Sequence, residues 1–258
     1  MFDELNTEIS NEDIKQLKNN RSAGPDLILN EFLINGKQIL MPVLHSMFNK
    51  IFVLGYFPDR WSEGYIIPLH KKGNPDDATN YRGITLLSCV GKLFTRILNN
   101  RLQNWAEKYN VYVEAQAGFR ANMSTVDNIF VLNGLISSFI NRRKQLFCTF
   151  VDFTKAFDYV VRENLWYKLI KLGVRGSMLN TIQSMYKSVK SRVKYKNKLG
   201  DTMPCTLGVR QGESLSPFLF AMFLNDLEDE YINVLFQVII FQFIVKSSCV
   251  KVNIHNFY

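Results

Sequence analysis

The sequence has few of the residues that build disulfide frameworks or zinc sites. Its 258 residues include only four cysteines and three histidines. The cysteines are far apart, with neither paired spacing nor histidines at zinc-site distances, at Cys89, Cys148, Cys205 and Cys249. We therefore interpret them as buried thiols in a reducing compartment.

The sequence also lacks the long apolar segments of a leader peptide or a membrane anchor. Its first ten residues are acidic and polar, without the apolar centre of a signal peptide. The longest apolar stretch, Val234 to Val245, is interrupted by Gln237 and Gln242 and is shorter than the roughly 20 residues that span a bilayer. We expect an intracellular protein of the cytoplasm or nucleus that is not secreted and has no membrane partner.

Positive charge is concentrated in one part of the chain. The whole sequence has 31 Lys and Arg against 23 Asp and Glu, a net charge of +8. From Arg142 to Arg210 the counts are 15 against 4, net +11, which leaves 16 against 19, net −3, elsewhere. This excess favours a polyanionic partner. The 47% of hydrophobic residues is ample for a packed core.

The pattern of apolar residues predicts helices first and a mixture of helices and strands later, which is typical of an α+β protein. Helices are expected at these places: a short one opened by Ser10, Ile39–Phe52 ended by Gly55, Val90–Trp105, one opened by Ser124 with Asp127 as its capping-box partner, Asn164–Leu172 closed by Gly173, Ser177–Lys187, and one starting at Pro217. Hairpins are expected around the loop Gly73–Asn80 and at Ser191–Thr206, and a buried strand at Leu146–Val151.

The segment VDFTKAFD, Val151 to Asp158, places Asp152 at the end of the buried strand and a second carboxylate six residues later. A buried acid without a partner is costly, so such a position holds a metal, pairs with a cation or caps a helix. Mg²⁺ prefers oxygen ligands, and a two-metal site suits phosphoryl transfer. A salt bridge to Lys155 or a helix cap is the structural alternative.

The segment GVRQGESLSPFLFAMFLND, Gly208 to Asp226, leads from a turn into a helix. Its two glycines allow a close approach to a ligand, and Gln211 has both a donor and an acceptor. Ser214 and Ser216 are expected to cap the helix that begins at Pro217, and helix N-termini favour phosphates. A well-capped structural helix is the alternative interpretation.

The segment IPLHKKGNPDDATNYRGITLL, Ile67 to Leu87, has cations on both sides of a polar loop. Lys71 and Lys72 precede the loop and Arg82 follows it, so a hairpin brings them together. Arg82 could then bind a triphosphate through bidentate contacts, with the lysines as point charges. A solvated cluster of surface charges is equally compatible with this segment alone.

Together with their neighbours, these segments resemble the reverse transcriptase domain of non-LTR (LINE-like) retrotransposons in order and spacing. The resemblance extends from about Lys15 to Tyr231 and includes three further stretches: KNNRSAGPD (18–26), NYRGITLLSCVGKLFTRILNNRL (80–102) and QAGFRANMSTVDNI (116–129). It implies the fingers of a right-hand polymerase at residues 1–145 and an incomplete palm at 146–231, without a thumb. Residues 232–258 form a tail that does not resemble the family.

The resemblance also implies roles for individual residues. Asp152 corresponds to the first metal-ligating carboxylate, and the backbone around Phe153 to a contact of the second Mg²⁺. Phe157 corresponds to the steric gate that excludes a ribose 2′-hydroxyl, although it can also be a core aromatic residue. Gln211 corresponds to a contact of the incoming nucleotide and template base. Triphosphate contacts correspond to Arg82 and to Lys71 or Lys72, and Asp158 is given a structural role.

A basic hairpin follows Val151–Asp158, the segment that the resemblance places first in the palm and that we call the first palm segment. Its cations alternate with Val193 and Tyr195 at the period of a strand, which predicts that they lie on one face of the hairpin. Together with the lysines just before the hairpin, these cations are Lys187, Lys190, Arg192, Lys194, Lys196 and Lys198. Such a face would bind nucleic-acid phosphates without sequence preference. A solvated edge strand protected by lysines is the alternative.

The sequence departs from the family after the Pro217 helix, where the resemblance implies a Tyr/Phe-Ala-Asp-Asp hairpin. Residues 231–258 contain no Asp or Glu, and we interpret the acidic cluster at Asp226, Glu228, Asp229 and Glu230 as a solvated helix end. Two smaller departures are Gly83 in place of Pro and Leu27 in place of Gly.

The expected function is that of an RNA-directed DNA polymerase domain that uses an RNA template, a DNA primer, dNTPs and Mg²⁺. We expect this chain to be inactive, because one aspartate cannot hold two Mg²⁺ ions against water. The alternative is a non-catalytic remnant that binds RNA or an RNA–DNA hybrid.

Overall fold

The computed structural model describes residues 3–11, 18–114, 116–146, 148–150, 153, 155–196, 198–227 and 239–241, with the backbone alone at 148–150 and 239–241. The helices are η1 (Asp3–Asn6), α1 (Asn30–Asn35), α2 (Lys37–Leu54), α3 (Asp59–Ser62), η3 (Ala78–Asn80), α4 (Cys89–Lys108), α5 (Thr125–Asn141), η4 (Ala156–Tyr159), α6 (Arg162–Leu172), α7 (Gly176–Lys187) and α8 (Ser216–Phe223). The strands are β1 (Glu63–His70), β2 (Tyr81–Leu87), β3 (Cys148–Phe150), β4 (Lys190–Tyr195), β5 (Lys198–Leu199), β6 (Met203–Pro204) and β7 (Ile239–Phe241). The chain is thus a mixed α/β protein, helical at first and mixed later.

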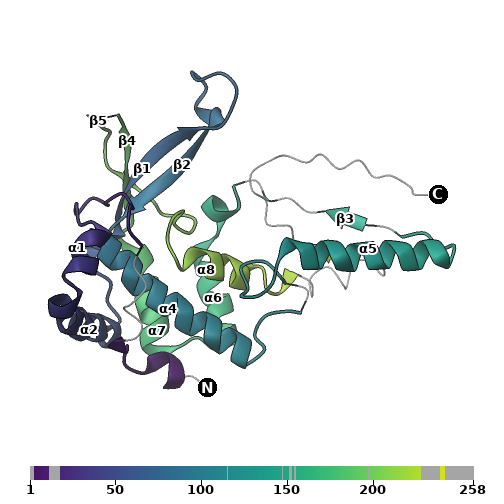
Figure 1. Ribbon diagram of the computed structural model, residues 1–258, viewed down its shortest axis with the longest axis horizontal. Helices are drawn as coiled ribbons and strands as arrows, with labels where there is room; N and C mark the ends of the chain where they lie inside the picture. The colour runs from purple at the N-terminus through teal and green to yellow at the C-terminus, as the bar shows by residue number, and fades with distance from the viewer. Residues whose placement is uncertain are drawn as a thin grey trace.

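A five-stranded sheet rises from one end of the helical body (Figure 1). β1 and β2 form the expected antiparallel hairpin, in register from Gly64 opposite Leu87 to His70 opposite Tyr81. β1 also pairs in parallel with β4, and β4 pairs with both β5 and β6. The parallel pairing joins the two predicted hairpins, far apart in sequence, into one sheet. β3 and β7 form a separate two-stranded parallel sheet.

Helix α4 is the centre of the hydrophobic core, in contact with α8 and η1. Its apolar residues recur every three or four positions, so one face is fully buried, including Leu93, Phe94, Ile97 and Leu98. Ser88 caps the helix by accepting a hydrogen bond from the Gly91 amide at 3.2 Å. Around α4, α2 contacts α7 and α6 contacts α8. The sheet and the loops of the candidate site are attached to this body.

Most of the helix boundaries expected from the sequence are confirmed. α2 ends at Gly55 and α6 at Gly173, both with left-handed backbone. The capping box of α5 forms, since the Ser124 hydroxyl accepts from the Val126 amide and Asp127 accepts from the Ser124 amide. Residues 12–17 of the first expected helix lie outside the described residues.

The prediction of a buried apolar face along α2 is wrong for the first half of the helix. Ile39 and Val43 are 80% and 60% exposed, whereas Phe48 and Phe52 are buried. Ile39 and Val43 share a helical stripe with Ser46 and Lys50, which are also exposed, so this stripe faces solvent.

Helix α5 extends away from the body and has no buried residue (Figure 1). Its exposed apolar side chains include Val126, Ile129 and Phe130. No helix in the described part of the chain is both long and apolar enough to cross a membrane.

Leu27 has φ +59, a backbone conformation that penalises side chains with a Cβ, and its side chain is 72% exposed. Its amide closes a turn onto the Gly24 carbonyl at 3.1 Å. Leu27→Gly should raise the free energy of unfolding by about 0.5–1 kcal/mol, because relief of the left-handed penalty exceeds the added chain entropy. Urea denaturation measures the change. Leu27→Ala keeps the strain and should change stability by less than about 0.5 kcal/mol; an equal gain from both variants would rule out backbone strain as the cause.

Candidate polymerase site and nucleic-acid interface

The first palm segment is described only in part. Asp152, the predicted metal ligand, lies outside the described residues. Phe153 is described, and its side chain is 37% exposed. After Lys155, with left-handed backbone, the short helix η4 carries Phe157 and Asp158.

The Gly208 segment lies directly against the first palm segment. The Gly208 amide donates to the Val160 carbonyl at 3.0 Å, and the Val209 amide donates to the Phe157 carbonyl at 2.8 Å. Gly208 has φ +79, and a Cβ there would lie 2.7 Å from the carbonyl oxygens of Phe157 and Asp158. Only glycine combines this φ with this approach.

The Arg162 side chain stabilises this contact between the Gly208 segment and the first palm segment. Its guanidinium donates to three carbonyls: Nε to Gly208 at 2.9 Å, Nη1 to Tyr186 at 3.1 Å and Nη2 to Leu207 at 3.2 Å. Its side chain is buried and lies over the Tyr186 ring at 5.0 Å. Burial lowers the pKa of Arg162, and the carbonyls and the ring offset the cost of burying its charge. No side-chain pattern in the sequence indicates this role, because the partners of Arg162 are backbone atoms distant in sequence.

Gln211 and Asp158 connect the two segments through their side chains. Gln211 Nε2 donates to Asp158 Oδ1 at 2.9 Å, and both residues lie at the surface. The structural role expected of Asp158 therefore includes a contact to the predicted nucleotide-binding glutamine. Because a carboxylate only accepts hydrogen bonds, the Oε1 atom of Gln211 remains available as an acceptor.

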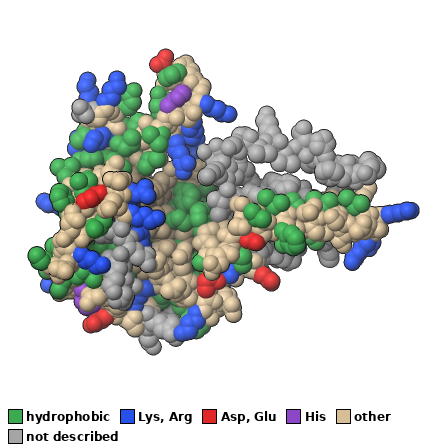
Figure 2. Space-filling view, viewed as in Figure 1, with side chains coloured by type: hydrophobic (Ala, Val, Ile, Leu, Met, Phe, Trp, Pro, Cys, Tyr) green, Lys and Arg blue, Asp and Glu red, His purple; other side chains and the backbone are tan. Residues whose placement is uncertain are grey.

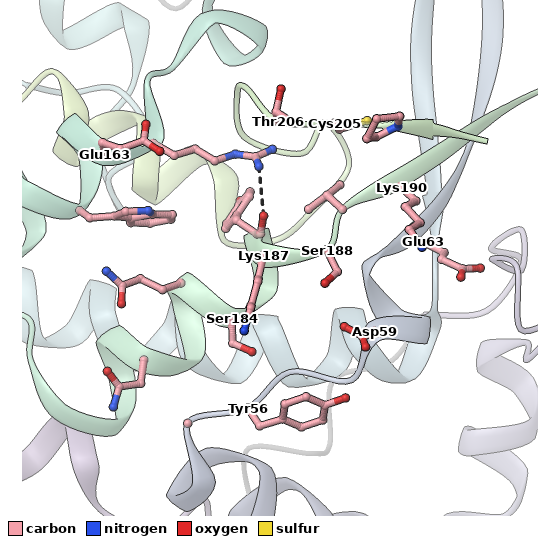
Figure 3. A pocket seen from close by; sticks show the side chains of 18 of the residues that line it. Tyr56, Asp59, Glu63, Glu163, Ser184, Lys187, Ser188, Lys190, Cys205 and Thr206 are labelled. Atoms are coloured by element: carbon pink, nitrogen blue, oxygen red, sulfur yellow. Dashed lines mark hydrogen bonds between the residues drawn. The ribbon is translucent and has the colours of Figure 1, made fainter. Parts of the chain in front are cut away.

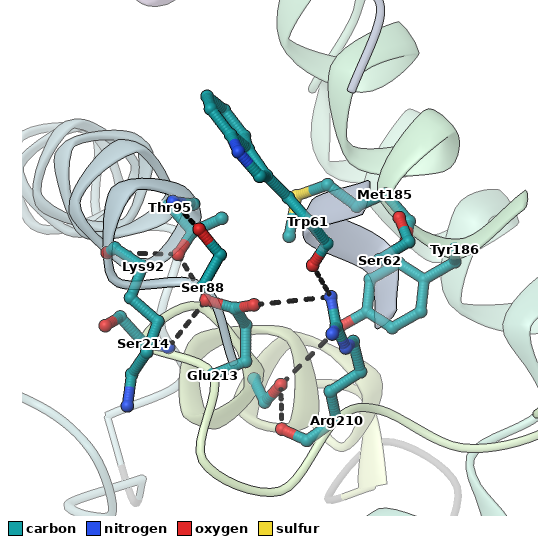
Figure 4. A network of polar contacts seen from close by, with 12 residues as sticks. Trp61, Ser62, Ser88, Lys92, Thr95, Met185, Tyr186, Arg210, Glu213 and Ser214 are labelled. Carbon is teal, nitrogen blue, oxygen red and sulfur yellow. Dashed lines mark hydrogen bonds and ion pairs between the residues drawn. The ribbon is translucent and has the colours of Figure 1, made fainter. Parts of the chain in front are cut away.

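The loop after Gln211 is anchored by a buried polar network (Figure 4). Arg210 donates to the carbonyls of Trp61 at 3.1 Å and Glu63 at 3.3 Å, and its Nη1 lies 3.7 Å from Glu213 Oε2. Glu213 also accepts from the Thr95 hydroxyl of α4 and from the Ser214 amide. The loop is thereby attached to α3, β1 and α4. The sequence signal for this network is a pair of opposite charges, Arg210 and Glu213, three residues apart in an otherwise uncharged stretch.

The expected capping of α8 by Ser214 and Ser216 is wrong. The N-cap position is Leu215, and no side chain caps the helix. The Ser216 hydroxyl instead donates to the Arg210 carbonyl at 2.7 Å and lies 3.4 Å from the Tyr186 hydroxyl. The serine therefore fixes the preceding loop rather than the helix end.

The predicted triphosphate cations lie on the β1–β2 hairpin. Lys71, Lys72 and Arg82 are all exposed, and the Lys71 amide donates to the Asn80 carbonyl at 2.8 Å. Three residues after Arg82, the Thr85 carbonyl oxygen would lie 2.8 Å from a Cβ on Gly212, which has φ +96. The hairpin that carries these cations thus meets the Gln211 loop at its base.

The basic residues of the second hairpin do not all share one face. Lys190, Arg192 and Lys194 alternate along β4 on the same face, and the Lys194 ammonium lies 5.6 Å from the Tyr65 ring centroid. Lys198 pairs with Tyr195 and so lies on the opposite face, because the chain reverses between them. Lys196 lies at this reversal with φ +54, and Lys187 belongs to the last turn of α7. The single face therefore consists of three cations.

Lys and Arg side chains gather on the hairpin and the body beneath it, along a hollow with an apolar floor that opens toward α5 (Figure 2). A separate cavity of about 970 Å³ lies among α3, α6, α7 and β4 (Figure 3). Lys187 and Lys190 line this cavity together with Asp59, Glu63 and Glu163. These acids reduce its attraction for phosphate.

The acidic cluster and the cysteines differ in part from what the sequence predicts. Asp226 is not simply solvated, because it forms an ion pair with Lys168 of α6, while Glu228, Asp229 and Glu230 lie outside the described residues. Among the cysteines, Cys89 is buried as expected, and burial raises the pKa of its thiol to about 11. Cys205 is only half-buried, and the side chains of Cys148 and Cys249 are not described.

Comparison with known proteins gives a consistent family match. Residues 69–244 match the family model described as reverse transcriptase (RNA-dependent DNA polymerase). The chain is 30% identical over 217 residues to a probable RNA-directed DNA polymerase from transposon BS of Drosophila melanogaster, covering 84% of this chain and 24% of that protein. It is 27% identical over 215 residues to the RNA-directed DNA polymerase from mobile element jockey of the same species, covering 83% and 23%.

A retrovirus-related Pol polyprotein from the type-1 retrotransposable element R2 of Nasonia vitripennis is 27% identical over 214 residues, covering 82% of this chain and 20% of that protein. The chain thus spans a quarter or less of the length of these relatives. Among solved structures, a chain of a partial Cas6-RT-Cas1–Cas2 complex aligns with 80% of this chain and 31% of its own length, at 16% identity and a TM-score of 0.38.

Gly208→Ala should lower the free energy of unfolding by ~2 kcal/mol or more, because the added Cβ meets two backbone carbonyls in a left-handed conformation. Chemical denaturation measures the loss. Gly134→Ala is the matched control, since nothing lies within 4 Å of its added Cβ in helix α5, and it should stabilise the protein by about 0.5–1 kcal/mol. Equal effects of the two changes would contradict the close backbone approach.

Burial raises the pKa of the Tyr186 phenol from its ordinary value near 10.0 to about 12. The neutral phenol is therefore favoured in the folded state, and its contribution to stability is fully present below pH 10 and lost as the pH rises toward about 12. Denaturation of the protein and of Tyr186→Phe on both sides of pH 10 should show a shallower decline for the variant. Burial also raises the pKa of Tyr112 to about 12. Titration of Tyr112 should therefore leave part of the decline in stability in both proteins. Identical pH profiles would show that Tyr186 does not titrate in this way.

Proposed function

Because the chain belongs to the reverse transcriptase (RNA-dependent DNA polymerase) family and is homologous to the polymerases of non-LTR retrotransposons, we propose that it forms the fingers and part of the palm of a right-hand polymerase. In this proposal it binds an RNA template paired with a DNA primer, and an incoming dNTP. The observation that carries the proposal is the convergence of three family segments. Gly208 touches the first palm segment, and Gly212 touches Thr85 of the fingers hairpin.

The nucleotide would lie where these segments meet. Arg82 and one of the lysines Lys71 and Lys72 would contact the triphosphate, because all three are exposed cations on one hairpin. Gln211 would offer its free Oε1 to a donor on the nucleotide or the template base. The half-exposed Phe157 ring would lie against the sugar and exclude a 2′-hydroxyl.

The template–primer duplex would contact the basic face of β4. Lys190, Arg192 and Lys194 lie on that face at alternate positions, as phosphate contacts along a strand require. Lys187, Lys196 and Lys198 would act at its margins, since they do not share the face. A location in the cytoplasm or nucleus is part of the proposal, because the widely spaced cysteines fit a reducing compartment.

The proposed metal is Mg²⁺, which would be held by Asp152 and the backbone of Phe153 and would activate the primer 3′-hydroxyl. The acidic side chains that the structure describes do not complete a two-metal site. Among the described residues, no group of three or more His, Cys, Asp or Glu side chains is placed to hold a metal ion. Asp158 is engaged with Gln211, and Asp226 with Lys168.

The second candidate function is non-catalytic binding of RNA or an RNA–DNA hybrid. It is favoured by one observation: residues 231–258 contain no Asp or Glu, while the basic face of β4 is intact. Both candidates require nucleic-acid binding, and only the first requires synthesis.

The binding step is tested with an RNA–DNA template–primer over a range of salt concentrations. Affinity should fall with salt, and the variant Lys190→Ala/Arg192→Ala/Lys194→Ala should reduce the slope of log K against log salt by roughly 2–3. The variant Arg142→Ala/Arg143→Ala/Lys144→Ala removes equal charge beyond the end of α5 and should leave most of the slope. Equal effects of both variants would show that net charge, and not the β4 face, governs binding.

The two candidates are separated by primer extension with Mg²⁺ and dNTPs. We expect no extension by this 258-residue polypeptide, because residues 231–258, where the resemblance implies a second carboxylate pair, contain no Asp or Glu. Extension that Asp152→Ala abolishes would overturn this expectation and establish polymerase activity with an additional ligand.

A further inference from the structure

We propose that Phe119 is a positioning residue that fixes the orientation of the Phe157 ring and so sets the preference for deoxyribonucleotides over ribonucleotides. Phe220 is the second residue that supports the Phe157 ring. This inference rests on the proposed role of Phe157 at the sugar of the incoming nucleotide. It adds a residue from a third segment, the loop between α4 and α5, to the selectivity of the site.

The Phe157 ring is held between two other rings. Phe119 meets it edge-on, with centroids 6.0 Å apart and planes at 73°, and Phe220 of α8 lies 5.0 Å away at 34°. Phe220 is buried and also meets Phe153 edge-on at 6.2 Å. Contacts between aromatic rings at these distances are favourable and directional, so the two neighbours restrict how far the Phe157 ring can turn. Phe157 and Phe119 are themselves only partly buried, which leaves part of the gate ring accessible.

The backbone of Phe119 is unusual for an aromatic residue. Its φ of +62 lies in the left-handed region, which bulky side chains rarely adopt and which persists where the surroundings enforce it. Those surroundings are present. Gln116 Nε2 donates to the Ala221 carbonyl of α8 at 3.2 Å, and Arg120 makes two bonds to Glu107 of α4, at 3.0 and 2.8 Å. The loop is thus tied to both helices on either side of Phe119.

This arrangement gives the loop a direct means of controlling sugar selection. A ribonucleotide differs from a deoxyribonucleotide by a single hydroxyl, so discrimination depends on where the edge of the Phe157 ring lies. A ring without its edge-on neighbour can move away from the sugar and admit that hydroxyl. A purely structural role for Phe119 would instead change stability and leave nucleotide discrimination unaffected.

The test measures dissociation constants for dATP and ATP in the presence of Mg²⁺ and a template–primer whose next template base is uracil. It compares the full chain with Phe119→Leu, Phe119→Tyr and Phe218→Leu. Phe218 is the matched control, because it is a buried residue of α8 whose ring meets Tyr112 edge-on at 6.2 Å and contacts no ring of the Phe157 cluster. Thermal denaturation of each variant gives its loss of stability.

The native chain should bind dATP more tightly than ATP. Phe119→Leu should reduce this ratio at least about tenfold, chiefly through tighter ATP binding, as expected when one group in a pocket is displaced. Phe119→Tyr, which keeps the ring, and Phe218→Leu, which is also destabilised, should both keep the ratio. If the native chain discriminates and Phe119→Leu does so equally well, the positioning role is wrong while the proposed site stands. If the native chain shows no preference, the gate role of Phe157 fails and this inference fails with it.

Discussion

The backbone contact between Gly208 and the Phe157–Val160 segment determines the position of the rest of the candidate site. Two main-chain hydrogen bonds set the register of the second family segment on the first, and no residue with a Cβ could come as close. Gln211 follows three residues later and so reaches Asp158. Gly212 then meets Thr85 at the base of the β1–β2 hairpin. One glycine contact therefore fixes the positions of Phe157, Gln211 and the cation-bearing hairpin relative to one another.

Buried charges maintain this contact, although burying charge is costly. Arg162 offsets the cost with three carbonyl acceptors, and Arg210 does so with two carbonyls and Glu213. Neither guanidinium is aimed at a ligand in this arrangement. Both side chains hold the loops on which Gln211 and Gly212 lie. A functional site requires such support, because its side chains must be positioned to within a fraction of an ångström.

Periodicity and turn residues predicted the architecture well, because these signals are local. The buried face of α4, the left-handed ends of α2 and α6 and the capping box of α5 each depend on residues within a few positions. What could not be predicted depends on distant partners. Ser216 bonds to a loop carbonyl instead of capping α8, Lys198 is turned to the other face by the chain reversal, and Ile39 faces solvent despite its apolar character. The partners of Arg162 are carbonyls, which no side-chain pattern reveals.

In the proposed site, the hairpin cations, Gln211 and Phe157 bind one nucleotide beside a template–primer. The most direct measurement is a crystal structure of the chain with an RNA–DNA template–primer and a dNTP. We expect the triphosphate at Arg82, the sugar against Phe157 and the duplex along the face of Lys190, Arg192 and Lys194. A nucleotide bound elsewhere, or a duplex on the opposite side of the sheet, would contradict the proposed site.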